Sequence, residues 1–104
     1  MEYNIETTDR AMNVTMQGQF TFTDNKRFRH IITKARKETL PITLNLSQLS
    51  FIDSAALGML LLLRDECQQR HIPISIHEAQ GQVEKIFYIT KFDQLFIMEP
   101  KPNL

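Results

Sequence analysis

Asp53 and Ser54 stand side by side in the most apolar stretch of the chain, Leu49–Leu63. An unpaired carboxylate is costly to bury, so an acidic residue is unexpected in a hydrophobic core. Side chains of both types can accept hydrogen bonds from the free N–H groups at the start of a helix. The Ser54 hydroxyl can also accept a phosphoryl group. We therefore expect the pair to mark both a helix start and a functional site.

The spacing of the apolar residues predicts the elements that position this pair. Alternating apolar residues predict strands over 3–7, 12–16, 41–52 and 73–77, with a possible last strand over 95–98. Helical spacing predicts helices over 21–38, 54–70 and 81–90. Thr23 is the expected cap of the first helix, and a turn at Asp9 and Arg10 makes the first two strands a hairpin.

This order, β-β-α-β-α-β-α-(β), predicts one α/β domain. Parallel strands need helical crossovers, so we expect a mixed sheet of about four or five strands packed with about three or four helices. Asp53 and Ser54 then lie where a strand gives way to a helix. Ligands and partners meet α/β folds at this edge.

Composition excludes several classes of function. The 104 residues carry a formal net charge of zero, which favours neither nucleic acid nor anionic membranes. The longest apolar run, Ala55–Leu63, is far shorter than the ~20 residues of a membrane span. A single cysteine, Cys67, indicates a reducing compartment, so a cytoplasmic location is expected. The three histidines lack metal-ligand spacing, and we predict neither metal nor cofactor.

The segment "LNLSQLSFIDSAALGMLLLL" resembles the signature of the STAS domain, as found in bacterial anti-sigma factor antagonists. The matching residues are Leu46, Phe51, Ile52, Asp53, Ser54, Leu57 and Gly58. The early "QGQF", the strand after Pro73 and the late "VEKIFYITKFDQLFIM" also follow in the order of that family. The resemblance implies a STAS domain over residues 1–99, followed by a loose tail over residues 100–104.

The resemblance also implies a mechanism. The serine at the position of Ser54 is phosphorylated in this family by a partner serine kinase of the histidine-kinase-like ATPase type, which doubles as the anti-sigma factor. The unphosphorylated domain binds that partner, and a matching phosphatase restores it. The chain is then a monomer or weak dimer without catalytic activity. STAS domains also serve without a sigma factor, as accessory subunits of transport or lipid-trafficking complexes or in other partner-switching signalling pathways, which is the alternative function.

The expected partner surface surrounds Ser54, which has no hydroxyl neighbour after it because position 55 is alanine. It includes the loop segment where relatives often carry Glu-Leu-Asp, and one side of the second helix. The predicted contact residues are Gln19, Phe20, Thr21, Asp53, Ser54, Ala55, Ala56, Met59 and Leu62.

Two other classes of function fit the residues less well. A receiver-type phosphoacceptor at Asp53 needs an acidic pair after the first strand to hold Mg²⁺, and only Asp9 lies nearby. A nucleophilic enzyme at Ser54 needs a base, an orienting acid and typically a Gly-x-Ser-x-Gly turn, which "IDSAA" lacks.

Overall fold

The strands form a single five-stranded sheet in the order β1-β2-β3-β4-β5 in the computed structural model, which describes residues 1–99. Only the first pair is antiparallel; all later neighbours are parallel. The strands are β1 (Glu2–Thr7), β2 (Met12–Phe20), β3 (Ile42–Ile52), β4 (Ile74–His77) and β5 (Ile97–Glu99). The mixed α/β fold predicted from the sequence is confirmed. The predicted tail over residues 100–104 lies outside the described residues.

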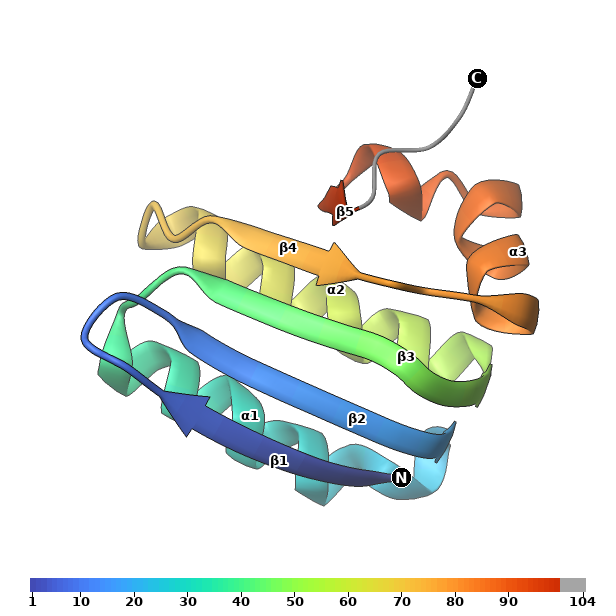
Figure 1. Ribbon diagram of the computed structural model, residues 1–104, viewed down its shortest axis with the longest axis horizontal. Helices are drawn as coiled ribbons and strands as arrows, with labels where there is room; N and C mark the ends of the chain where they lie inside the picture. Colours follow the sequence, from blue (N-terminus) through green and yellow to red (C-terminus); the bar gives the residue numbers. More distant parts are fainter. Residues whose placement is uncertain (100–104) are drawn as a thin grey trace.

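Three α-helices and two 3-10 turns connect the strands. They are η1 (Phe22–Asp24), α1 (Asn25–Glu38), α2 (Ser54–Gln69), α3 (Gly81–Ile89) and η2 (Phe92–Gln94). The first two helices lie behind the sheet and cover one of its faces, whereas α3 lies to one side, beyond the end of β4 (Figure 1). Within residues 1–99, we find no helix with both the length and the apolar character needed to cross a bilayer.

The core lies between the sheet and the two covering helices. Successive residues of a strand point to opposite faces, so one side chain in two is buried. The buried strand residues include Met12, Val14 and Met16 on β2 and Ile42, Leu44 and Leu46 on β3. From α1, four residues at helical spacing are buried: Phe28, Ile31, Ile32 and Ala35.

Several boundaries differ from those predicted, and the second strand, predicted over 12–16, continues to Phe20 as β2. Thr23 does not cap the first helix, because the turn η1 precedes α1 and begins after Thr21. The last strand was predicted over 95–98, but β5 spans Ile97–Glu99, since η2 and Leu95 take up the preceding residues. Short apolar runs define strands poorly at their ends, which explains the shift.

Cys67 is buried on α2, with 1% of its surface exposed. Burial raises the pKa of its thiol to about 11, with a further contribution from the negative charge of Glu66. Because the thiolate is the reactive form, we expect the folded protein at pH 8 to react slowly with Ellman's reagent. In denaturant the thiol becomes exposed, and we expect one thiol per chain to react rapidly with the reagent. Rapid reaction of the folded protein would contradict the burial of this residue.

Candidate functional site

The site lies where β2 and β3 end together. The two strands are parallel, and their last residues, Phe20 and Ile52, are partners in the register. Gly18 adopts a φ of 90°, a left-handed conformation that suits glycine, at the point where the register of β2 shifts. The backbone N–H of Asp53 donates to the carbonyl of Phe20 at 3.2 Å. This pairing places the start of α2 beside the loop that follows β2.

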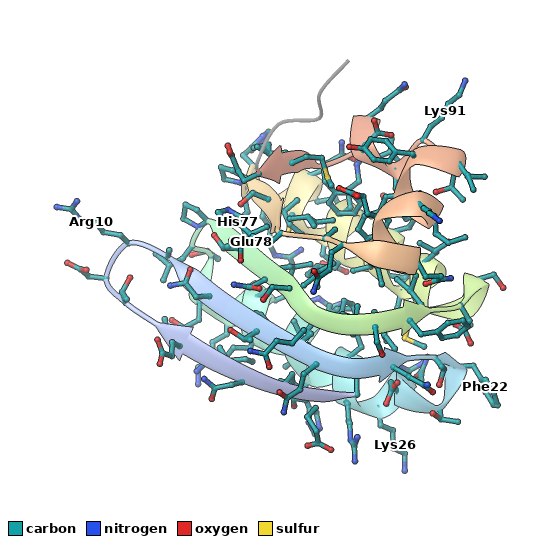
Figure 2. All side chains as sticks on the ribbon, turned by 45° about the vertical axis from the view of Figure 1, so that its right-hand side comes forward. Arg10, Phe22, Lys26, His77, Glu78 and Lys91 are labelled. Carbon is teal, nitrogen blue, oxygen red and sulfur yellow. The ribbon has the colours of Figure 1, made fainter. Side chains whose placement is uncertain are left out.

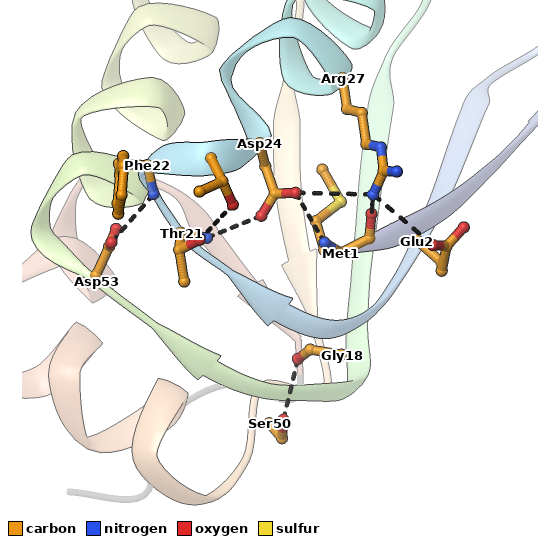
Figure 3. A network of polar contacts seen from close by, with 10 residues as sticks. Met1, Glu2, Gly18, Thr21, Phe22, Asp24, Arg27, Ser50 and Asp53 are labelled. Carbon is orange, nitrogen blue, oxygen red and sulfur yellow. Dashed lines mark hydrogen bonds and ion pairs between the residues drawn. The ribbon is translucent and has the colours of Figure 1, made fainter.

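Asp53 joins these two segments through its carboxylate. Its Oδ1 accepts from the backbone N–H of Ala56 at 2.8 Å, so Asp53 is the N-cap of α2. Its Oδ2 accepts from the backbone N–H of Phe22 at 3.1 Å (Figure 3). One side chain therefore both caps the helix and holds the loop after β2. The half-buried carboxylate is thus doubly hydrogen-bonded, which explains how an acidic residue stands in so apolar a segment.

Ser54 is the first residue of α2 and is exposed. Because Asp53 provides the cap, the Ser54 hydroxyl is left available to other partners. The first backbone hydrogen bond of the helix runs from the N–H of Leu57 to the carbonyl of Asp53, at 3.1 Å. The N–H groups of Ser54 and Ala55 come before it, at the positive end of the helix dipole. An exposed hydroxyl beside such N–H groups is a suitable position for a phosphate.

A second carboxylate, that of Asp24, fixes the loop after β2. It is buried, and its Oδ2 accepts from the backbone N–H of Thr21 at 2.9 Å. Its Oδ1 accepts from the α-ammonium group of Met1 at 2.8 Å, and Arg27 lies 3.9 Å away (Figure 3). Burial alone would raise the pKa of Asp24, but the hydrogen bonds from Met1 and Thr21, with the charge of Arg27, lower it overall.

This lowered pKa predicts a pH dependence of stability. A carboxyl group whose pKa is lower in the folded state stabilises the fold above its unfolded pKa, and the contribution is lost as the pH falls through the folded pKa. We expect the free energy of unfolding to decrease below pH 3.8, the ordinary pKa of this group. Denaturant titrations between pH 7 and pH 2 should show a smaller decrease in Asp24→Asn. Equal decreases in both proteins would contradict this role of Asp24.

Gln82 on α3 also holds the end of β3, and the sequence did not predict this role. Its side-chain carbonyl accepts from the backbone N–H of Ile52 at 3.1 Å, and its amide nitrogen donates to the Ile52 carbonyl at 3.2 Å. The neighbouring Gln80 donates to the carbonyl of Ser47. These contacts tie the start of α3 to the strand immediately before Asp53 and Ser54.

The predicted contact residues divide into a surface set and a core set. Ser54, Ala55, Gln19 and Leu62 are exposed, and Leu62 lies in a groove between α1 and α2. Gln19 and the half-buried Thr21 line an open surface depression of about 700 Å³. Three further predicted contact residues are buried in the core, so a partner docked on this surface reaches their side chains only if the packing changes: Phe20, Ala56 and Met59.

The histidines are distributed over other elements. His30 on α1 contacts the hydroxyl of Tyr3 at 3.4 Å, and His77 on β4 contacts the hydroxyl of Ser75 at 3.3 Å. His71 follows the end of α2. Within residues 1–99, none of the three hydrogen-bonds to Ser54, and no group of three or more histidine, cysteine or acidic side chains is arranged to hold a metal ion.

The fold and the site define a class of protein: a small α/β domain that presents a serine at the start of a helix following a buried strand. The family model of the STAS domain matches residues 2–104. The chain belongs to the STAS domain family. A STAS-domain containing protein of Pseudomonas aeruginosa (strain UCBPP-PA14) is 34% identical over 87 residues, which are 84% of this chain and 86% of that protein.

Solved structures share the fold at low sequence identity. The anti-sigma factor antagonist SpoIIAA of Bacillus has been solved unphosphorylated and phosphorylated, with a TM-score of 0.73 to each form. The identities are 18% and 17%, over 97% and 96% of this chain and 90% and 93% of those chains. The murine solute carrier 26 family member A9 anion transporter gives a TM-score of 0.73 at 21% identity, over 88% of this chain and 16% of the transporter.

Proposed function

We propose that the chain is a phosphorylation-controlled protein-binding module of the anti-sigma factor antagonist type. The unphosphorylated form binds a partner, and phosphorylation of Ser54 blocks that binding. The observation that carries this proposal is the exposed Ser54 hydroxyl at the start of α2, next to a separate residue that caps the helix. The likeness to SpoIIAA, which exists in a phosphorylated form, supports it.

The reaction at Ser54 would be an ordinary phosphoryl transfer from ATP on the partner kinase. The Ser54 Oγ attacks the γ-phosphorus, the bond between that phosphorus and the bridging oxygen breaks, and ADP leaves. A base on the kinase takes the hydroxyl proton. This chain is the substrate in the reaction, and we assign it no catalysis of its own.

The modified serine would gain a charge of about −1.5 to −2 at neutral pH. The free N–H groups and the dipole of α2 can hold this charge, so the fold is kept. A partner docked over the same end of the helix would have to remove water from the phosphate beside the Asp53 carboxylate. This cost, together with the lost fit, separates the two proteins.

The proposed contact surface consists of the predicted contact residues that are exposed or half-buried: Gln19, Thr21, Asp53, Ser54, Ala55 and Leu62. The partner is a serine kinase of the histidine-kinase-like ATPase type, with a matching phosphatase, in the cytoplasm. This assignment is supported by the likeness to anti-sigma factor antagonists.

The test is a phosphorylation assay. Each histidine-kinase-like ATPase encoded in the same genome is purified and incubated with this chain and ATP, and the intact mass is measured. We expect one ATPase to add a single phosphate, which peptide mapping places on Ser54, and Ser54→Ala to remain unmodified. A phosphate on Ser47, Ser50 or Thr90 instead, or no phosphate with any ATPase, would contradict the proposal.

The likeness to the anion transporter supports a second candidate, an accessory subunit of a membrane transport complex. The available hydroxyl of Ser54 favours the first candidate, because a purely structural subunit has no need of it. Two results together would favour the accessory function: no ATPase modifies the chain, and after crosslinking the chain copurifies with a transport complex.

A further inference from the structure

Phe22 is a large aromatic side chain with 69% of its surface exposed. Its ring projects outward from the end of the molecule (Figure 2). Phe22 was not predicted as a site residue, yet its backbone N–H donates to Asp53, the residue before Ser54. The backbone that carries the exposed ring is therefore held to the residue next to the proposed phosphorylation site.

The loop that carries this ring is held rigidly. Asp24 and Thr21 are joined by two hydrogen bonds, from the N–H of Thr21 to the Asp24 carboxylate at 2.9 Å and from the N–H of Asp24 to the Thr21 carbonyl at 3.0 Å. The N–H of Phe22, between them, is fixed to Asp53 at 3.1 Å. A side chain presented by such a backbone loses little conformational entropy on binding. Aromatic residues, Phe included, are enriched at protein interfaces, where a few residues carry most of the binding energy.

An enzyme that brings the γ-phosphate of ATP to the Ser54 hydroxyl must cover the start of α2 and the loop fixed to it. We propose that Phe22 is the aromatic anchor of this contact, inserted into an apolar pocket that lies beside the phosphoryl-transfer site of an ATP-dependent serine kinase. The proposal rests on the proposed function and names the residue that supplies the binding energy at the same site.

The charge at the site favours this occupant over a second copy of the chain. A two-fold contact between copies through this surface would bring the two Asp53 side chains toward each other, and their like charges repel. A kinase meets no such restriction. Its contact surface is not a copy of this one, so the contact does not place two identical carboxylates face to face.

The test uses the purified ATPase that phosphorylates Ser54 in the assay described above, loaded with ADP, and measures its affinity for variants by calorimetry. Phe22→Ala is expected to weaken binding by about tenfold or more, and Phe22→Leu, which keeps an apolar side chain, by less. The matched control is Ile97→Ala on β5, which removes another exposed apolar side chain and should change the affinity by less than about twofold. Denaturant titration should show Phe22→Ala as stable as the parent, because the ring is exposed.

Three results would overturn the assignment. If Phe22→Ala binds as tightly as the parent while Ser54 is still phosphorylated, Phe22 is not the anchor and the proposed function stands. If no ATPase phosphorylates Ser54, the proposed function and this inference fail together. If sedimentation shows a dimer of the chain that Phe22→Ala dissociates, the surface binds a second copy instead.

Discussion

Ser54→Asp is expected to weaken binding of the partner kinase by about 2 kcal/mol or more, because it places a charge where the docked surface excludes water. The substitution adds one charge to a position next to Asp53, so two carboxylates would have to be desolvated together. Aspartate carries less charge and fewer oxygens than a phosphate, and the effect of true phosphorylation should be larger. Calorimetric titration with the ADP-bound ATPase measures the affinity of Ser54→Asp and of the phosphorylated protein.

Ser54→Ala is the control for this substitution. It removes only a hydroxyl, so we expect parent-like affinity and no response to ATP. Asp53, not Ser54, accepts the hydrogen bond that caps α2, and the cost to folding should stay below about 0.5 kcal/mol. Unchanged affinity in both Ser54→Asp and the phosphorylated protein would leave Ser54 without a role as a switch.

Asp53→Ala is expected to lower the free energy of unfolding by about 2 kcal/mol, because it removes a helix cap and a second hydrogen bond at once. The bonds lost are those from the N–H groups of Ala56 and Phe22. Asp53→Asn retains one side-chain carbonyl oxygen, which can accept one of the two hydrogen bonds. We therefore expect it to lower the free energy of unfolding by about half as much as Asp53→Ala does. Urea titrations of the three proteins measure these differences.

Asp65→Ala is the matched control, since it removes an exposed carboxylate from the middle of the same helix. Asp65→Ala should change the free energy of unfolding by no more than about 0.5 kcal/mol. An effect of Asp53→Ala equally small would show that the carboxylate bridge between α2 and the loop contributes nothing to stability.

The elements with a clear period were predictable from the sequence. Alternation in β2 and β3 and helical spacing in α1 each reflect one buried face, so the strands, the helix and their order followed from the residues alone. The start of α2 at Asp53 and Ser54 was predictable for a different reason. Adjacent polar residues at the boundary between two apolar elements have few structural roles other than capping.

Contacts between segments distant in the sequence were not predictable in this way. The second bond of Asp53 reaches Phe22, and Gln82 reaches Ile52; each depends on which strand and helix ends the fold brings together. Met59 was misassigned to the surface for a related reason. The run Met59–Leu63 is apolar on all sides, so periodicity alone could not show which side chains face the sheet, and only Leu62 is exposed.

The contacts of Gln80 and Gln82 with β3 have a consequence for the behaviour of the protein at high concentration. β3 extends beyond β4, which pairs only with Ile42–Asn45, so among residues 1–99 the second half of β3 has no neighbouring strand on that side. An open strand edge recruits strands from other molecules and leads to aggregation. The two side-chain amides occupy backbone groups of Ser47 and Ile52 along that edge, much as a neighbouring strand would. Through these two glutamines, the element that supports the Ser54 site also protects the sheet against polymerisation.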